Sequence, residues 1–189
     1  MRERRRSAEA AGDDVSPGGA HPPGEDPEAK ARALCLRMLA HTPRTRSQLE
    51  RALLRRGFEE EVVGSVLGAF TGAGLIDDEA FSRAWVDSRH HARGLSRRAL
   101  ARELRTRGVQ EDTVREAVSH LSDEDEVDAA RALARKSLAG SRAKAQETRI
   151  RRALGVLARK GYPAGLSYRV VREGLEAEGA EVDLDAPDP

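Results

Sequence analysis

The chain contains 189 residues, with 33 basic and 32 acidic side chains and a formal net charge of +1. Its single cysteine excludes an internal disulfide. No apolar run is long enough for a transmembrane helix or, after the arginines at residues 4–6, for a secretory signal. We therefore expect a cytoplasmic protein.

The first 27 residues differ from the rest of the chain. They are rich in glycine, proline, arginine and aspartate and contain no apolar cluster, so we expect a disordered tail over residues 1–27. Apolar residues at helical spacing then predict a helix that ends at Thr42, because the following proline disfavours helical backbone. Its stripe consists of Ala33, Leu36, Leu39 and Ala40.

A second helix is predicted to begin after Thr45. Thr45 and Gln48 have the spacing of a capping box, in which each side chain accepts a hydrogen bond from the other residue's backbone. Gly57 supplies a left-handed stop. The glutamates at residues 59–61 then place negative charge at the positive end of a third helix, which ends at Gly72 to Gly74.

The same order recurs with a fixed offset of 51 residues. Asp77 or Asp78 caps a helix, Gly94 ends it, and Ser96 caps the next one. Eight positions of the first unit return in the second without an insertion, which marks a repeat. The pairs join Leu49, Leu53, Arg56, Gly57, Val63, Val66, Leu67 and Phe70 to Leu100, Leu104, Arg107, Gly108, Val114, Ala117, Val118 and Leu121.

A third and less exact unit follows. Ser122 with Asp125 forms a weaker capping box, and residues 139–146 are small and polar, which predicts the longest internal loop. Beyond this loop the match to the second unit has an offset of 53 residues. It includes Ala153, Leu157, Lys160, Gly161 and Tyr162.

The periodicity predicts an all-α fold, an elongated array of three tandem three-helix repeats. The expected repeats are residues 28–76, 77–121 and 122–177, followed by an acidic tail over 178–189. One unit of short helices is expected to be unable to bury its own apolar face, so it must pack against its neighbours. Phe81 and Trp85 are predicted to form the core seam between the first two repeats, with direct partner contact as the alternative.

The charges are segregated along the chain. From Arg89 to Arg107 seven arginines accompany one acid, whereas residues 173–189 carry seven acids and no base. On helical wheels the arginines fall opposite the apolar stripes, which predicts a basic ridge along the middle helices. Its partner-binding candidates are Arg89, Arg98, Arg102, Arg105, Arg152 and Arg159, with Arg51 and Arg55 in equivalent places. The alternative is an ordinary solvated face.

Catalytic motifs are absent from the sequence. It contains no glycine-rich phosphate loop and no metal-spaced set of cysteine and histidine residues, so we predict no enzyme activity, cofactor or metal. His90 and His91 point about 100° apart on a helix and cannot share a metal; we interpret them as partly exposed residues near a helix end. Cys35 is interpreted as a small core or interface residue.

One stretch carries a family resemblance. Residues 74–89 read GLIDDEAFSRAWVDSR and resemble the central motif of the RecX regulatory proteins. Residues 102–109, RELRTRGV, and 159–162, RKGY, are similar to two further blocks of that family, although Lys160 and Tyr162 depart from its usual arginine and phenylalanine. The similarity covers residues 29–177 or so.

The resemblance implies a monomeric, non-enzymatic protein that binds the RecA filament. Members of that family modulate, and usually inhibit, the ATPase and recombinase activities of RecA in DNA repair and the SOS response. Single-stranded DNA is a further candidate partner. Two rivals remain: a DNA-binding helical protein that acts without RecA, because short helices joined by glycine-containing turns resemble helix-turn-helix units, and a scaffold without nucleic acid.

Overall fold

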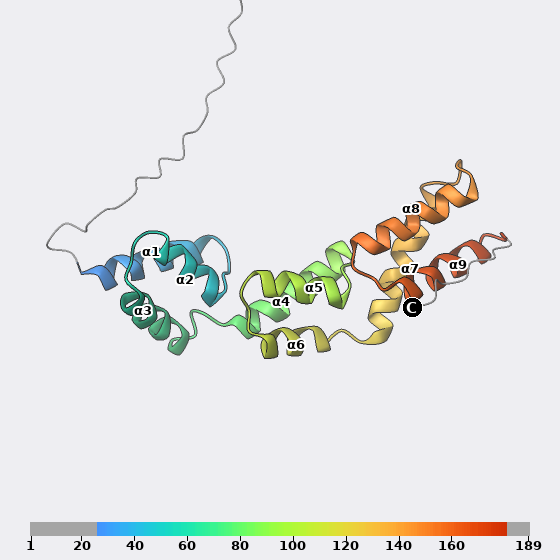
Figure 1. The fold of residues 1–189 in the computed structure, drawn as a ribbon. Helices are drawn as coiled ribbons and strands as arrows, with labels where there is room; N and C mark the ends of the chain where they lie inside the picture. The colour runs from blue at the N-terminus through green and yellow to red at the C-terminus, as the bar shows by residue number, and fades with distance from the viewer. Residues whose placement is uncertain (1–25, 181–189) are drawn as a thin grey trace, which may run out of the picture.

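The computed structural model describes residues 26–180, which form nine α-helices and no strand (Figure 1). The helices are α1 (Pro27–His41), α2 (Arg46–Leu54), α3 (Glu60–Gly72), α4 (Asp78–Arg93), α5 (Arg97–Thr106), α6 (Glu111–Ser119), α7 (Asp123–Ala139), α8 (Gln146–Arg159) and α9 (Ala164–Glu176). They form three triplets in an elongated array, as predicted. No helix in this range has the length and apolar character needed to span a membrane.

Helix starts and stops follow the predicted chemistry. Thr45 with Gln48 and Ser122 with Asp125 form complete capping boxes at α2 and α7. These side chains satisfy backbone N–H groups that the first helical turn leaves without partners. Left-handed backbone follows the helices at Gly57, Gly94, Gly108 and Gly161.

The first helix differs from the prediction in two ways. Asp26 caps α1 and Pro27 is its first residue, so these two positions belong to the helix and not to the predicted tail. The remaining residues of the two predicted tails lie largely outside the described range, which omits 1–25 and 181–189. The buried face of α1 is centred on Ala31 and Cys35, whereas Leu36 is 49% exposed.

Each repeat has its own apolar core, which corrects the expectation that a unit must bury its apolar face against its neighbours. The buried clusters lie within residues 31–76, 86–121 and 130–175, and no buried apolar residue is shared between them. In each repeat three short helices cross closely enough to enclose a small core. Leu53, Leu104 and Leu157 occupy equivalent positions and are fully buried.

The polar contacts between repeats lie at helix ends: they join successive middle helices, and they join a middle helix to the first helix of the next repeat. At the first joint, between repeats 1 and 2, the Thr45 hydroxyl donates to the Arg107 carbonyl oxygen at 2.7 Å. The backbone N–H of Arg46 donates to Asp78 Oδ1 at 2.9 Å. Asp78 thus serves the neighbouring repeat, while Asp77 caps α4 itself.

The second joint, between repeats 2 and 3, uses the same plan with more contacts. The backbone N–H of Ser96 donates to the Lys160 carbonyl oxygen at 3.0 Å. Arg97 donates through its backbone N–H and its Nε to Glu126, at 2.9 and 2.8 Å, and also pairs with Asp123. The middle helices α8, α5 and α2 therefore follow one another end to end, with each C-terminus facing the next N-terminus (Figure 1).

Tyr162 anchors the second joint and provides a test at high pH. Its side chain is buried in the third core, and its hydroxyl donates to the Gly94 carbonyl oxygen at 3.1 Å. Burial, with a smaller effect of Glu126, raises the pKa of Tyr162 to about 12. Because the folded pKa lies above the unfolded value of about 10, the stability that the neutral phenol contributes is complete below pH 10 and is lost as the pH rises through 12.

We expect an ultraviolet titration to show one tyrosine ionising near pH 12 together with loss of the second joint. Tyr162→Phe should remove that step. The absence of any tyrosine transition near pH 12 would contradict the burial of Tyr162.

Candidate interaction surface

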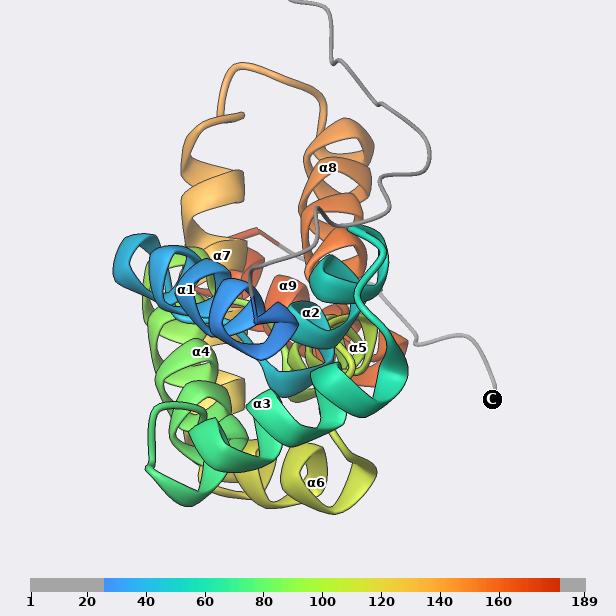
Figure 2. The ribbon, with the colours of Figure 1, turned by 90° about the vertical axis from the view of Figure 1, so that its left-hand side faces the viewer.

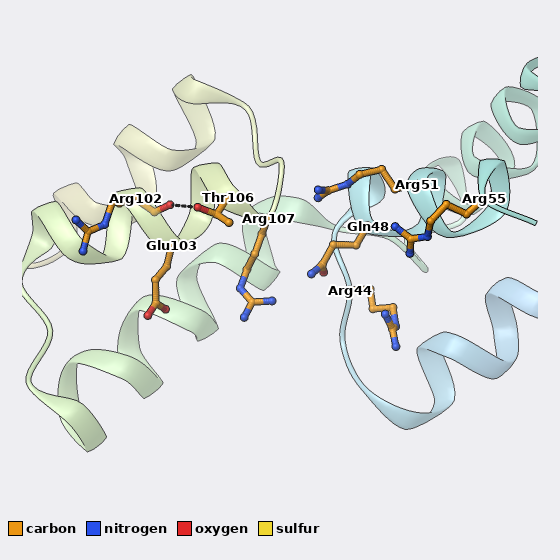
Figure 3. A pocket seen from close by; sticks show the side chains of 8 residues that line it. All are labelled: Arg44, Gln48, Arg51, Arg55, Arg102, Glu103, Thr106 and Arg107. Carbon is orange, nitrogen blue, oxygen red and sulfur yellow. Dashed lines mark hydrogen bonds between the residues drawn. The ribbon is translucent and has the colours of Figure 1, made fainter. Parts of the chain in front are cut away.

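A basic groove lies across the first joint. Its volume is about 540 Å³, and both neighbouring repeats contribute side chains to it (Figure 3). We call it the joint groove; its lining is Arg44, Gln48, Arg51 and Arg55 from repeat 1 and Arg102, Glu103, Thr106 and Arg107 from repeat 2. The start of α2 meets the end of α5, which brings the two helices into line, so residues along both helices, from Arg102 in α5 to Arg55 at the end of α2, line one groove.

The arginines of the joint groove lack carboxylate partners among residues 26–180. Arg44, Arg51, Arg55, Arg102 and Arg107 make no ion pair there, and the buried Nε of Arg44 has no hydrogen-bond partner. Glu103 is the one acid in the lining, and its Oε2 accepts a hydrogen bond from Trp85 Nε1 at 2.9 Å. The groove therefore presents a concentrated positive potential.

Trp85 supports one wall of this groove, which corrects its predicted place in a core seam between the repeats. The indole is half-buried against the core of repeat 2, with the Phe81 ring stacked at 5.7 Å. The guanidinium carbons of Arg107 and Arg89 lie 3.6 and 4.2 Å from its ring centroid. Burial lowers the pKa of Arg107; the nearby Glu103 opposes this effect and Arg89 adds to it.

Replacing Trp85 with alanine should therefore loosen the groove without unfolding the chain. Because the ring is only partly buried, we expect the free energy of unfolding to fall by about 2 kcal/mol. Truncating a fully buried tryptophan typically costs about 3 to 5 kcal/mol. Arg107 should also lose its fixed orientation. Thermal unfolding measures the first effect and the Arg107 Nε–H NMR signal measures the second. Global unfolding at room temperature would show that Trp85 is a core residue.

The predicted basic ridge divides into separate groups of residues. Arg102 lines the joint groove, and Arg89 lies on the Trp85 ring. Arg98 is exposed outside the joint groove. Arg105 is also exposed, but it pairs with Glu111 through two hydrogen bonds at 2.7 and 2.8 Å. The ion pair lowers the pKa of Glu111, so Arg105 is already matched by an internal anion.

A second basic groove lies within repeat 3, between α7 and α8, and we call it the third-repeat groove. It contains the predicted residues Arg152 and Arg159 together with Arg151 and Lys136. Its volume is about 470 Å³.

A third groove crosses the second joint and has a different character. Its walls include the aliphatic side chains of Leu121, Leu133 and Val156 as well as both acids and bases. His91 is exposed there, but His90 is only 6% exposed and its Nδ1 lies 3.0 Å from the Leu95 carbonyl oxygen. His90 is thus a buried structural residue, which corrects our interpretation of it as partly exposed.

Sequence reasoning missed several residues of the joint groove. Arg44, Gln48, Thr106 and Arg107 were not among the candidates, although they lie next to helix ends that the sequence marks clearly. Their convergence depends on the joint. The sequence repeat could have predicted this convergence only with the added knowledge that the end of one middle helix meets the start of another.

The fold and its grooves define a tandem array of three-helix domains that presents basic surfaces at and beside its joints. Within residues 26–180 no cluster of three or more histidine, cysteine or acidic side chains is placed to hold a metal. Family models of the first, second and third three-helix domains of RecX match residues 31–68, 77–118 and 123–171. The chain belongs to the RecX family.

Relatives and solved structures agree with this assignment. Regulatory protein RecX of Thermobifida fusca is 57% identical over 179 residues, which cover 95% of this chain and 96% of the relative. The protein of the same name from Streptomyces coelicolor is 52% identical over 161 residues, 85% of this chain and 86% of the relative. The crystal structure of RecX from Lactobacillus salivarius, 17% identical, has a TM-score of 0.70 over 78% of this chain and 96% of that chain, and supports the fold alone.

Proposed function

We propose that this protein binds the RecA filament in the cytoplasm and restrains its ATPase and recombinase activities during DNA repair and the SOS response. The observation that carries the proposal is the presence of three RecX domains in one elongated array, together with relatives that are named regulatory proteins. We propose that it acts as a monomer and needs no cofactor.

The geometry supports this proposal through length and charge. An array of three separate cores joined end to end offers several charged surfaces along one line, which suits contact with successive subunits of a filament. The proposed contacts are Arg89, Arg98, Arg102, Arg105, Arg152 and Arg159. Arg105 would have to leave Glu111 to take part, so we rank it below Arg102 and Arg152.

A second candidate function is binding to nucleic acid without RecA. The unpaired arginines of the joint groove favour it, because such a cluster attracts phosphate groups of any polyanion. This function predicts a higher ratio of protein to DNA than regulation of the filament does, because a protein that competes for the strand must cover the strand.

A titration of RecA ATPase activity on single-stranded DNA separates the two functions. A filament modulator should suppress hydrolysis at amounts well below that of RecA, whereas a DNA competitor should act only near the amount that covers the strand. Suppression that disappears when DNA is added in excess at fixed RecA would favour the competitor. No effect at equimolar protein would refute regulation of RecA.

A further inference from the structure

The joint groove combines two features: a cluster of arginines without ion pairs and a position across the connection between two repeats. Several arginines outside the groove are matched by acids of other helices: Arg97 by Glu126, Arg105 by Glu111 and Arg131 by Glu173. The five arginines of the joint groove have no such partner within residues 26–180. Glu103 is the one acid in the lining, so it offsets only part of the repulsion among these five charges, and a bound anion would offset more.

The lining indicates the chemical class of that anion. It contains no aliphatic or aromatic side chain, and its donors are the guanidinium groups and the Gln48 amide, since the Thr106 hydroxyl already donates to the Arg102 carbonyl oxygen at 2.9 Å. Guanidinium groups match phosphate oxygens with two parallel hydrogen bonds. Protein partners usually insert apolar or aromatic anchors, for which the groove at the second joint, with Leu121, Leu133 and Val156, is better suited.

The two joints differ in how firmly they hold their repeats. The second joint has the Arg97 ion pairs, the buried Tyr162 hydroxyl and a backbone hydrogen bond from Ser96. At the first joint the Thr45 hydroxyl donates to the Arg107 carbonyl oxygen and the Asp78 carboxylate accepts from the Arg46 N–H, with no ion pair across it in the described range. Fewer contacts mean a lower cost of opening, so the first joint is the natural hinge.

We propose that the joint groove binds the phosphodiester backbone of a nucleic-acid strand and that its occupancy fixes the angle between repeat 1 and the rest of the array. Arg51 and Arg55 lie on one side of the hinge and Arg102 and Arg107 on the other, so a bound backbone bridges two repeats and cancels their repulsion. This inference goes beyond regulation of RecA and can be tested without it.

The binding test replaces three exposed groove arginines and compares them with a charge-matched control. Arg51, Arg55 and Arg102 are changed together to glutamine, which keeps helix propensity. The control variant changes Arg32, Arg115 and Arg172 to glutamine as well. Each of these arginines pairs with a carboxylate on its own helix. The probe is single-stranded oligothymidylate, titrated at several salt concentrations.

We expect the groove variant to lose about 2 from the slope of log affinity against log salt, roughly 0.7 for each contact, which corresponds to about 100-fold weaker binding at 0.1 M salt. The control variant should bind nearly as the unchanged protein does. Equal losses in both variants would overturn the site. Equal affinity for polyglutamate of matched charge would overturn the phosphate class and favour an acidic protein partner.

The hinge test measures distances by fluorescence transfer in the full chain. One pair of labels, at Glu61→Cys and Gln110→Cys, spans the first joint, and a second pair, at Gln110→Cys and Ala177→Cys, spans the second joint. These three positions are exposed. The native Cys35 is fully buried, and burial raises the pKa of its thiol, so it should not be labelled.

Oligothymidylate should change and narrow the distance distribution across the first joint and leave that across the second joint unchanged. The groove variant should show no such change at the same concentration. Binding without a change at the first joint would overturn the hinge. Failure of either test leaves the RecA titration unaffected, so the two proposals fail independently.

Discussion

Truncating the central leucine of one repeat is expected to destabilise that repeat far more than its neighbours. Leu53, Leu104 and Leu157 are equivalent, fully buried and placed in three separate cores. Each leucine-to-alanine change should cost about 2 to 5 kcal/mol, through lost burial and the cavity that remains. A core in a unit of this size provides only a small free energy of unfolding, so the affected repeat should unfold locally.

Amide hydrogen exchange can locate this effect. For Leu104→Ala, protection should fall most in α4 to α6, with smaller losses in repeats 1 and 3, which keep their own cores. Leu53→Ala and Leu157→Ala should move the loss to the first and third repeats. An equal loss of protection along the whole array would show that the three cores unfold as one cooperative unit.

Local features of this fold could be predicted from sequence because their physics is local. The Thr45 and Ser122 capping boxes involve residues three apart, and the left-handed stops at Gly57 and Gly94 depend on a single residue. A repeated pattern of such signals was enough to predict three helical triplets in an elongated array.

The assignment of apolar residues to cores could not be predicted in the same way. Periodicity identifies an apolar face but not the surface that covers it, so Trp85 was placed between repeats when it packs on its own repeat. In α1, alanine and leucine residues occur on two faces, and the sequence favoured the one that includes the exposed Leu36. Which face is buried depends on α3, which packs against it.

The candidate surface shows the same limit. Helical wheels predicted that Arg102 and Arg105 share an exposed face, and both are exposed. Their different electrostatic surroundings come from the next helix, which places Glu111 beside Arg105, and from repeat 1, which contributes Arg51 and Arg55 to the groove that Arg102 lines. Such pairings arise from tertiary structure, so the sequence of a single helix does not show which charges will lie near its arginines.

Replacing Gly108 or Gly161 with alanine is expected to disturb a joint, whereas the same change at Gly57 should cost backbone strain alone. All three glycines follow a middle helix with nearly equal positive φ values of 79°, 86° and 81°, so each alanine should pay a similar strain of about 1 to 2 kcal/mol. Only their surroundings differ. Gly57 has open space around it, so Gly57→Ala is a matched control.

A methyl group at Gly161 would lie 2.8 Å from Ala99 Cβ, and one at Gly108 would overlap the Ser47 side chain. Overpacking of this kind typically adds about 1 to 3 kcal/mol. At the firmly held second joint, Gly161→Ala should therefore lower the melting temperature more than Gly57→Ala does. At the first joint the repeats can separate instead, so Gly108→Ala should lose the hydrogen bond from Thr45 to Arg107 and widen the Glu61–Gln110 distance distribution. Equal melting temperatures and unchanged distances in all three variants would show that close packing of these glycines does not set the joint geometry.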